Sequence, residues 1–173
     1  MNLTTPDKQD LRQIKKLYRT AFPRIERKPF RLILRQCKKG EAELFAVRTD
    51  SGRFAGFAVT VMFGDIVMLD YFAIHPKLRG RGIGSRVLKM LMSKYADRRF
   101  ILEIESVSSP CRNLVIRQKR REFYLKNGMK TAGFTAHVFF TDLEVLTAGM
   151  PVSFDEYREL YAAHLGRRAN KKI

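Results

Sequence analysis

The sequence predicts one α/β (α+β) domain in which helices flank a mixed, mostly antiparallel central sheet. Three observations lead to this fold class. Two amphipathic segments precede three apolar runs that only short turns separate, a pattern typical of an antiparallel meander. A strand–helix–strand unit follows at residues 66–107, where one parallel pairing fits. The chain has 173 residues, 45% of them hydrophobic, which is enough to bury one core and fits a single domain over residues 1–173.

The first part of the chain is expected to hold two helices and three strands. Asp7 can cap a first helix, and the segment PFRLILRQCKKG predicts a second, short helix that ends at Gly40. The runs ELFAVRT, FAGFAVTVMF and IVMLDYFAIH predict three strands, of which the last two are apolar enough to be buried on both faces. The apolar face of the first helix is expected to consist of Leu11, Ile14, Leu17, Tyr18 and Ala21.

Helices and strands alternate in the rest of the chain. FILEIESV predicts a strand, and CRNLVIRQKRREFYLKNG predicts a helix that ends at Gly128. KTAGFTAHVFF and TDLEVLTAG predict two more strands, and Ser153 with Glu156 forms a capping box for a last helix at about 153–165. The helix expected after the glycines at 80–84 has its apolar residues at helical spacing: Ile83, Val87, Leu88, Leu91, Met92 and Tyr95.

The chain is strongly basic. Its 34 Lys and Arg residues against 17 Asp and Glu residues give a net charge of +17. This surplus favours anionic partners, namely a phosphorylated cosubstrate, a nucleic acid or an acidic surface. It disfavours a large cationic substrate unless a local acidic pocket receives it.

Composition also limits the compartment and the metal chemistry. No apolar run is long enough to cross a bilayer, and MNLTTPDKQD lacks the apolar core of a signal peptide, so we expect a cytoplasmic protein with no membrane partner. Cys37 and Cys111 have no paired spacing, which disfavours a disulfide framework. His75, His137 and His164 share no metal-ligand spacing, so we expect no metal.

The segment RGRGIG, residues 79–84, lies between a predicted strand and a predicted helix. Gly80, Gly82 and Gly84 allow tight turns and a close approach of a ligand to the backbone. The first turn of the following helix offers free N–H groups and a partial positive charge, which suit a phosphate. Arg79, Arg81 and Arg86 add full charges, although a flexible, solvated basic loop is the alternative.

Two common phosphate motifs do not fit this segment. The sequence G-x-x-x-x-G-K-[ST] is absent. The dinucleotide fingerprint G-x-G-x-x-G would need a glycine at Ser85, and it expects its glycines directly after the strand, where HPKL intervenes here.

A third pattern fits: the segment resembles the acyl-CoA signature R/Q-x-x-G-x-G/A of the GNAT family of N-acetyltransferases. Here it reads Arg79-Gly80-Arg81-Gly82-Ile83-Gly84, after FAIHP. Downstream, ILEIESV is similar to the family's fifth strand. RREFYLKNGM is similar to its FYxKxGF segment, with methionine where phenylalanine is more usual. The resemblance covers about residues 43–140. Many members open with a strand, and MNLTT is short for one.

The resemblance implies a site for acetyl-CoA. The pyrophosphate would lie on the backbone amides of residues 80–85, and the pantetheine arm would run along YFAIH, against main-chain groups of Phe72 and Ile74. An N–H near Phe72 or Ala73 would polarise the thioester carbonyl. The implied cofactor-binding residues are Phe72, Ala73, Ile74, Arg79, Gly80, Arg81, Gly82, Ile83, Gly84 and Ser85.

Transfer to an amine needs a base, because the attacking amine must be neutral. Asp70 is the first candidate, since it lies on the strand beside the implied thioester, where GNAT members often have an acidic residue. Glu103 and Glu105 follow, because they share one face of the neighbouring strand, where two carboxylates are costly unless solvated or used. For each of the three, a solvated or salt-bridged acid near the many arginines is the alternative.

The leaving thiolate needs a proton or a hydrogen bond. Tyr124 matches the general acid in the family's FY pair, with a core tyrosine as the alternative. Cys111 is a weak candidate for an acyl-transfer nucleophile, since no histidine is nearby in the sequence.

The residues and the resemblance together predict a GNAT-like acyltransferase that moves an acetyl group from acetyl-CoA to a primary amine by direct attack. The acceptor, a small molecule or a protein, is not identified. A basic protein associated with RNA or ribosomes and an acyl-CoA sensor without turnover are the alternatives. The basic run RQKRRE at 117–122 is either a contact for the CoA phosphates or a solvated helix face. Monomer and homodimer both remain open.

Overall fold

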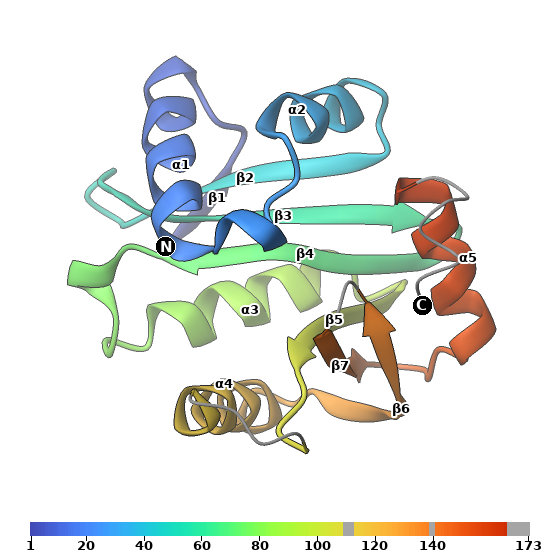
Figure 1. Ribbon diagram of the computed structural model, residues 1–173. Coiled ribbons are helices and arrows are strands. Elements are labelled where there is room, and N and C mark those ends of the chain that lie inside the picture. Colours follow the sequence, from blue (N-terminus) through green and yellow to red (C-terminus); the bar gives the residue numbers. More distant parts are fainter. Residues whose placement is uncertain (109–112, 139–140, 166–173) are drawn as a thin grey trace. The chain divides into compact units, whose positions relative to one another are not determined.

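The computed structural model describes residues 1–108, 113–138 and 141–165, and Figure 1 traces their helices and strands. The chain divides into two compact units. The first consists of Met1–Met62 and Leu69–Lys94, and the second of Phe63–Met68 and the chain from Tyr95 onward. Strand β4 belongs to both, because its first three residues lie in the second unit.

The first unit is built on strands β1 to β4, which are neighbours in that order. Strands β1 and β2 pair antiparallel, with Leu3 opposite Val47, and so do β2 and β3, with Leu44 opposite Val59. The elements are β1 (Asn2–Thr4), α1 (Lys8–Ala21), η1 (Arg24–Glu26), α2 (Phe30–Lys38), β2 (Ala42–Arg48), β3 (Phe54–Phe63), β4 (Ile66–Ile74), η2 (Pro76–Leu78) and α3 (Ile83–Lys94).

Helices cover both faces of this part of the sheet. One core contains side chains from α1, α2 and strands β2 to β4, namely Ile14, Leu17, Tyr18, Ile33, Leu44, Ala46, Phe57, Val59, Tyr71 and Ala73. Phe45 points to the opposite face, because side chains alternate along a strand. The Lys94 ammonium of α3 lies 5.6 Å from the centre of the Phe45 ring. Helices α1 and α2 therefore cover one face, and α3 covers the other.

The second unit places β7 between β5 and β6. Both pairings are antiparallel, with Leu146 opposite Leu102 of β5 and Leu143 opposite Ala136 of β6. The elements of this unit are β5 (Arg99–Glu105), α4 (Leu114–Lys126), β6 (Lys130–Val138), β7 (Thr141–Ala148) and α5 (Phe154–Leu165).

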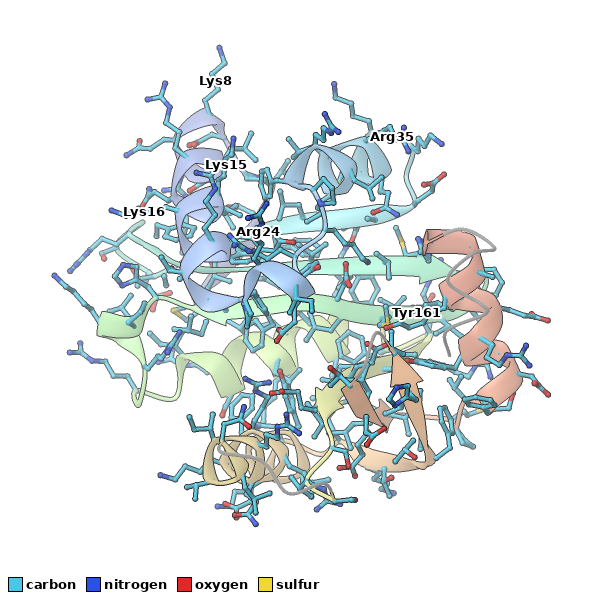
Figure 2. All side chains as sticks on the ribbon, viewed as in Figure 1. Lys8, Lys15, Lys16, Arg24, Arg35 and Tyr161 are labelled. Atoms are coloured by element: carbon cyan, nitrogen blue, oxygen red, sulfur yellow. The ribbon has the colours of Figure 1, made fainter. Side chains whose placement is uncertain are left out.

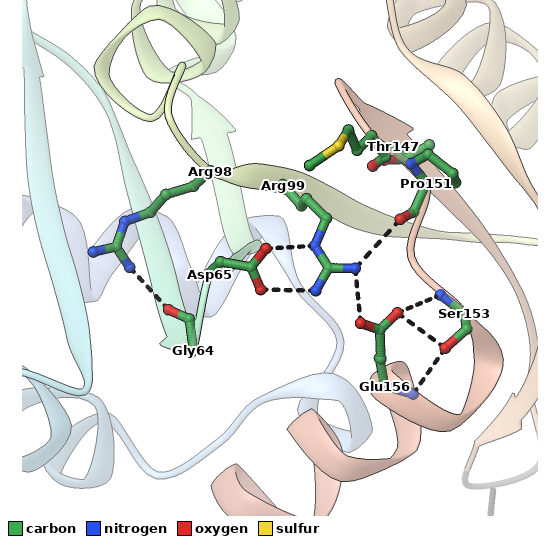
Figure 3. Close-up of polar contacts among 9 residues, drawn as sticks. Gly64, Asp65, Arg98, Arg99, Thr147, Pro151, Ser153 and Glu156 are labelled. Atoms are coloured by element: carbon green, nitrogen blue, oxygen red, sulfur yellow. Dashed lines mark hydrogen bonds and ion pairs between the residues drawn. The ribbon is translucent and has the colours of Figure 1, made fainter.

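Arg99 joins three segments of the second unit (Figure 3). Its guanidinium donates two hydrogen bonds of 2.7 Å to Asp65, and it also lies 2.8 Å from a carboxylate oxygen of Glu156. The Glu156 carboxylate accepts from the Ser153 N–H at 2.9 Å, and the Glu156 N–H donates to the Ser153 hydroxyl at 3.3 Å. These contacts lower the pKa of both carboxyl groups below the usual values.

The predicted fold class is confirmed: helices flank strands that are mostly antiparallel. The predicted cap at Asp7 and the predicted capping box at Ser153 both form, and every predicted helix and strand is present within the described residues. Positions 111–112 of one predicted helix and 139–140 of one predicted strand lie outside the described residues. The structure adds β1, which pairs with β2 although it has only three residues. The parallel pairing between the strands on either side of α3 stays a prediction, as does the single domain. No helix in the described ranges is long and apolar enough to cross a membrane.

Candidate active site

The glycine segment, residues 79–84, connects β4 to α3 within the first unit. After β4, the short helix η2 closes through hydrogen bonds from the Leu78 N–H to the His75 carbonyl (2.8 Å) and from the Arg79 N–H to the Pro76 carbonyl (3.2 Å). The chain then passes through Gly80 and Gly82 into α3. Ile83, at the first position of that helix, is buried and so fixes the start of α3 against the core.

At two of the three glycine positions, the backbone conformation requires glycine. Gly80 has φ of 73° and Gly82 has φ of 71°, values that residues other than glycine adopt only with backbone strain. Neither has an atom within 4 Å of where a Cβ would lie, so the space beside both is open. The Gly82 carbonyl accepts the first helical bond, from the Arg86 N–H at 3.1 Å. The N–H groups at 83–85 consequently begin α3 without an intrahelical acceptor.

The arginines of the segment have different surroundings. Arg79 donates from Nε to the Ile74 carbonyl at 3.0 Å, so it ties the loop back to the end of β4. Arg81 and Arg86 are exposed, and no carboxylate of the described residues forms an ion pair with them. Two full positive charges therefore stand beside free helix N–H groups, an arrangement that suits the phosphates of a nucleotide.

The end of β4 is held unusually close to β3. A Cβ at Gly56 would lie 2.3 Å from the Ala73 carbonyl oxygen and 3.1 Å from the Ile74 Cα. The His75 N–H donates to the Ala55 carbonyl at 2.8 Å. Gly56 thus fixes the backbone of the strand that the resemblance assigns to the pantetheine arm.

The predicted cofactor residues therefore form one continuous path from β4 to the first turn of α3. Ala73 is buried, whereas Phe72, Ile74, Gly84 and Ser85 are partly exposed. Their roles in binding stay predictions, and the geometry described above is what supports them.

Asp70 forms an ion pair. Its carboxylate lies 2.8 Å from the Lys28 ammonium, and only 11% of the Asp70 side chain and 14% of the Lys28 side chain are exposed. This is the salt-bridged arrangement that the sequence analysis left open. The contact with Lys28 uses the Oδ2 atom of Asp70, so a substrate amine would give its proton to Oδ1, or would displace Lys28 to reach Oδ2.

Two buried tyrosines hold Lys28 in this place. The Lys28 N–H donates to the Tyr71 hydroxyl at 3.1 Å, and its carbonyl accepts from the Tyr18 hydroxyl at 3.0 Å. The Tyr71 hydroxyl in turn donates to the Glu26 carbonyl at 2.8 Å. Burial raises the pKa of both tyrosines, to about 12 for Tyr18, so both remain hydrogen-bond donors at neutral pH.

The two glutamates on β5 are also engaged, each within the second unit. Glu105 lies 2.7 Å from the Arg117 guanidinium and 3.3 Å from that of Arg120. Glu103 accepts a hydrogen bond of 2.7 Å from the Tyr161 hydroxyl. Both alternate with buried residues of β5, so they share a face of the strand as predicted.

Tyr124 lies on α4, in the second unit, with its ring 5.0 Å from that of Phe123. Removal from water raises the pKa of Tyr124 to about 12. Among the residues that the structure describes, none hydrogen-bonds to the Tyr124 hydroxyl. Its catalytic role stays a prediction.

The described residues contain one cysteine and no group of metal-ligating side chains. Cys37 is a free, half-buried thiol, and burial raises its pKa. Cys111 lies outside the described residues. Within residues 1–108, 113–138 and 141–165, no three His, Cys, Asp or Glu side chains are grouped to hold a metal ion.

Sequence reasoning missed two residues of this region. Lys28 gave no signal, because its partner Asp70 is 42 positions away in the chain. Gly56 did carry one, since an isolated glycine in an apolar strand often marks a close backbone approach.

Comparison with known proteins agrees with the resemblance. The acetyltransferase (GNAT) family model matches residues 11–128. No curated protein matches the sequence. A GNAT-family acetyltransferase from Bacteroides thetaiotaomicron has the same fold, with a TM-score of 0.79 and 19% identity, over 96% of this chain and 99% of that one.

Two further solved structures share the fold and act on different acceptors. One is spermidine N-acetyltransferase from Vibrio cholerae, in complex with CoA and spermine: TM-score 0.68, 14% identity, 85% of this chain and 94% of that one. The other is ribosomal-protein-S18-alanine N-acetyltransferase from Escherichia coli, with a TM-score of 0.63 and 16% identity, over 88% of this chain and 99% of that one. At these identities the likeness concerns the fold alone.

Proposed function

The chain belongs to the GNAT family of acetyl-CoA-dependent N-acetyltransferases, and we propose that it transfers the acetyl group directly to a primary amine at the site that follows β4. The observation that supports this most is the glycine segment. Gly80 and Gly82 have left-handed backbones, the first N–H groups of α3 have no intrahelical acceptor, and Arg81 and Arg86 are exposed cations with no ion pair to a carboxylate of the described residues. Together they suit the pyrophosphate of acetyl-CoA.

The proposed path of the cofactor follows the chain backward from this segment. The N–H groups at 80–85 would bind the pyrophosphate, with Arg79 holding the loop to the end of β4. The pantetheine arm would lie against main-chain groups of Phe72 and Ile74. An N–H at Phe72 or Ala73 would stabilise the oxyanion that develops as the amine attacks the thioester.

Proton transfer is the demanding part of this reaction. A lysine-like amine, with a pKa of about 10.4, costs about 4.6 kcal/mol to deprotonate at pH 7. Asp70 is the proposed base, directly or through water, with Glu105 and Glu103 as alternatives. The ion pair with Lys28 shows that this carboxylate already accommodates an ammonium group, and an acceptor amine has the same chemistry.

Tyr124 is proposed to assist the leaving thiolate. Its pKa of about 12 exceeds the value of about 8.5 for a thiol, so complete proton transfer to the thiolate is unfavourable. The hydroxyl would therefore stabilise the thiolate by donating a hydrogen bond, with final protonation from water.

The acceptor is proposed to be a small molecule or a protein with few positive charges of its own. Residues 8–39 contain twelve Lys and Arg residues and two Asp and Glu residues, a net charge of +10. A polyamine would be repelled by this segment. We place the enzyme in the cytoplasm, as a monomer or homodimer.

The direct test measures CoA thiol release from acetyl-CoA with amines of three kinds: polyamines, aminoglycosides and peptide N-termini. Release with any of these amines, with an acetylated product in the mass spectrum, supports acetyl transfer. Release with peptide N-termini supports the proposed acceptor class, whereas release with polyamines or aminoglycosides alone contradicts it. Acetyl-CoA binding without release to any amine favours the sensor. Radiolabel retained on the denatured protein without an acceptor contradicts direct transfer.

The second candidate function is association with RNA or ribosomes. The net charge of +17 favours it, because one CoA does not require so large a surplus. Association with RNA or ribosomes is compatible with acetyl transfer, but it requires a binding surface separate from the cofactor site.

A further inference from the structure

We infer that the outer surface of α1, η1 and α2 binds the phosphodiester backbone of a nucleic acid, without reading its sequence. This basic face is defined by nine exposed cations: Lys8, Arg12, Lys15, Lys16, Arg19, Arg24, Arg31, Arg35 and Lys38. The inference does not depend on the acetyl-transfer chemistry.

The five cations of α1 share one side of the helix. With 3.6 residues per turn, Lys8, Arg12, Lys15, Lys16 and Arg19 fall within an arc of about 100°. The buried residues of α1 lie on the opposite side, in the core. Figure 2 shows Lys8, Lys15 and Lys16 along this helix.

The surface continues over α2 with the same character. Arg31, Arg35 and Lys38 are spaced at i, i+4 and i+7, so they form a stripe on the exposed side of α2. Both helices bury their apolar sides in one core, and Arg24 of η1 lies between them in the chain. Figure 2 labels Arg24 and Arg35 on these elements.

These charges are not neutralised within the part of the chain that the structure describes. None of the nine has a carboxylate partner there. The single acid of α1, Asp10, is buried and paired with Arg48 at 2.8 Å, and α2 contains no acid. An ordinary solvated helix alternates its charges, because like charges at i, i+4 destabilise it. This face instead maintains a repulsion that a polyanion would relieve.

The composition of the face indicates which polyanion. The outer arc of α1 has no apolar side chain to insert into a bilayer, since the apolar residues of this helix are in the core, and η1 adds a single exposed one, Ile25. It has no aromatic side chain on which a base could stack. What remains is a row of cations, which contacts phosphates and carries no sequence information.

The test is fluorescence anisotropy with a labelled 20-nucleotide oligo(U), repeated from 50 to 200 mM salt. The wild type is compared with a triple variant, Lys15→Gln, Lys16→Gln and Arg19→Gln, in which glutamine preserves helix propensity. A control variant, Lys89→Gln, Lys119→Gln and Lys130→Gln, removes the same charge from exposed positions elsewhere. Melting curves are used to check that both variants fold.

The slope of log K against log salt separates the outcomes. Each phosphate contact on a single strand contributes about −0.7, so the α1 variant should have a slope flatter by about 2, and the control should match the wild type. An oligo(dT) of equal length should bind equally, because only phosphates are contacted. Equal weakening in both variants, a slope near zero in the wild type, a requirement for one sugar, or binding only to phosphatidylserine vesicles would overturn the inference.

Discussion

Substitution of Gly56 by alanine tests how the fold positions the cofactor strand. The new Cβ would lie 2.3 Å from the Ala73 carbonyl oxygen, whereas real Cβ atoms essentially never come within 3.0 Å. One backbone must therefore shift by about 0.7 Å. The nearest obstructing atoms, at 2.3 Å and 3.1 Å, belong to the Ala73 and Ile74 backbone, so a change of rotamer cannot remove the overlap.

The size of the effect follows from this overlap. Overpacking at a buried position costs about 1–3 kcal/mol, and a backbone clash belongs in the upper half of that range. The lower entropy of alanine in the unfolded chain offsets about 0.4–1 kcal/mol. A net loss of about 1–2.5 kcal/mol in the free energy of unfolding remains. For a chain of this length, the melting temperature should fall by about 2–10 °C.

The assay combines melting curves with calorimetric titration of acetyl-CoA at 20 °C, where the variant is folded. We expect at least a tenfold weaker affinity, because the displaced segment, Ala73–Ile74, lies on the proposed pantetheine path. Gly52→Ala serves as the control: Gly52 has φ of 77° with open space around it, so that variant loses stability but should bind acetyl-CoA normally. Unchanged melting and unchanged affinity in Gly56→Ala would show that Gly56 does not position the Ala73–Ile74 backbone for acetyl-CoA.

Three other perturbations probe the proposed chemistry and the second unit. Tyr124→Phe should lower kcat by about 10–100-fold, the value of one hydrogen bond to a charged group, with little change in acetyl-CoA affinity. Because the pKa of Tyr124 is about 12, ionisation of its hydroxyl should not lower the wild-type rate below pH 10. Equal rates in Tyr124→Phe and the wild type would remove Tyr124 from the mechanism. Asp70→Asn should lower kcat most at neutral pH and recover as pH rises, because the acceptor then loses its proton without help; a uniform loss at all pH values would contradict a base. The Arg99 guanidinium lowers the pKa of Asp65 in the folded protein, so the contribution of Asp65 to stability is present above its unfolded pKa and is lost as pH falls through the folded value. Arg99→Met should therefore lose less stability than the wild type during acid titration, and parallel acid unfolding curves would show that the ion pairs contribute nothing.

Local signals in the sequence were sufficient for most of the fold. The caps at Asp7 and Ser153 set the starts of two helices, because a cap is a contact between residues three positions apart. The glycines at 40 and 128 ended two others through their left-handed backbones. Strand β1 escaped prediction, since its three residues are stabilised by pairing with β2 and by no pattern of their own.

The part of the candidate site formed by neighbouring residues in the sequence could be predicted. The part formed by residues that tertiary packing brings together could not. The amino-acid sequence of segment 79–85 was sufficient to interpret it, because the glycine spacing fixes the turn and the start of the helix. The ion pair of Asp70 could not, because Lys28 approaches it through the tertiary packing of Tyr18 and Tyr71. Glu105 was likewise a candidate base from its strand position, while the two arginines that bind it come from the next helix.

The most direct test of the central claim is calorimetric titration of the wild type and of Gly82→Val with acetyl-CoA and with CoA that lacks its 3′-phosphate. Gly40→Val is the matched control, because Gly40 has φ of 74° and open space but lies at the end of α2. We predict micromolar binding of acetyl-CoA to the wild type and to Gly40→Val, and none to Gly82→Val. Equal binding to all three proteins would mean that the phosphates bind elsewhere and that residues 80–85 do not form the cofactor site.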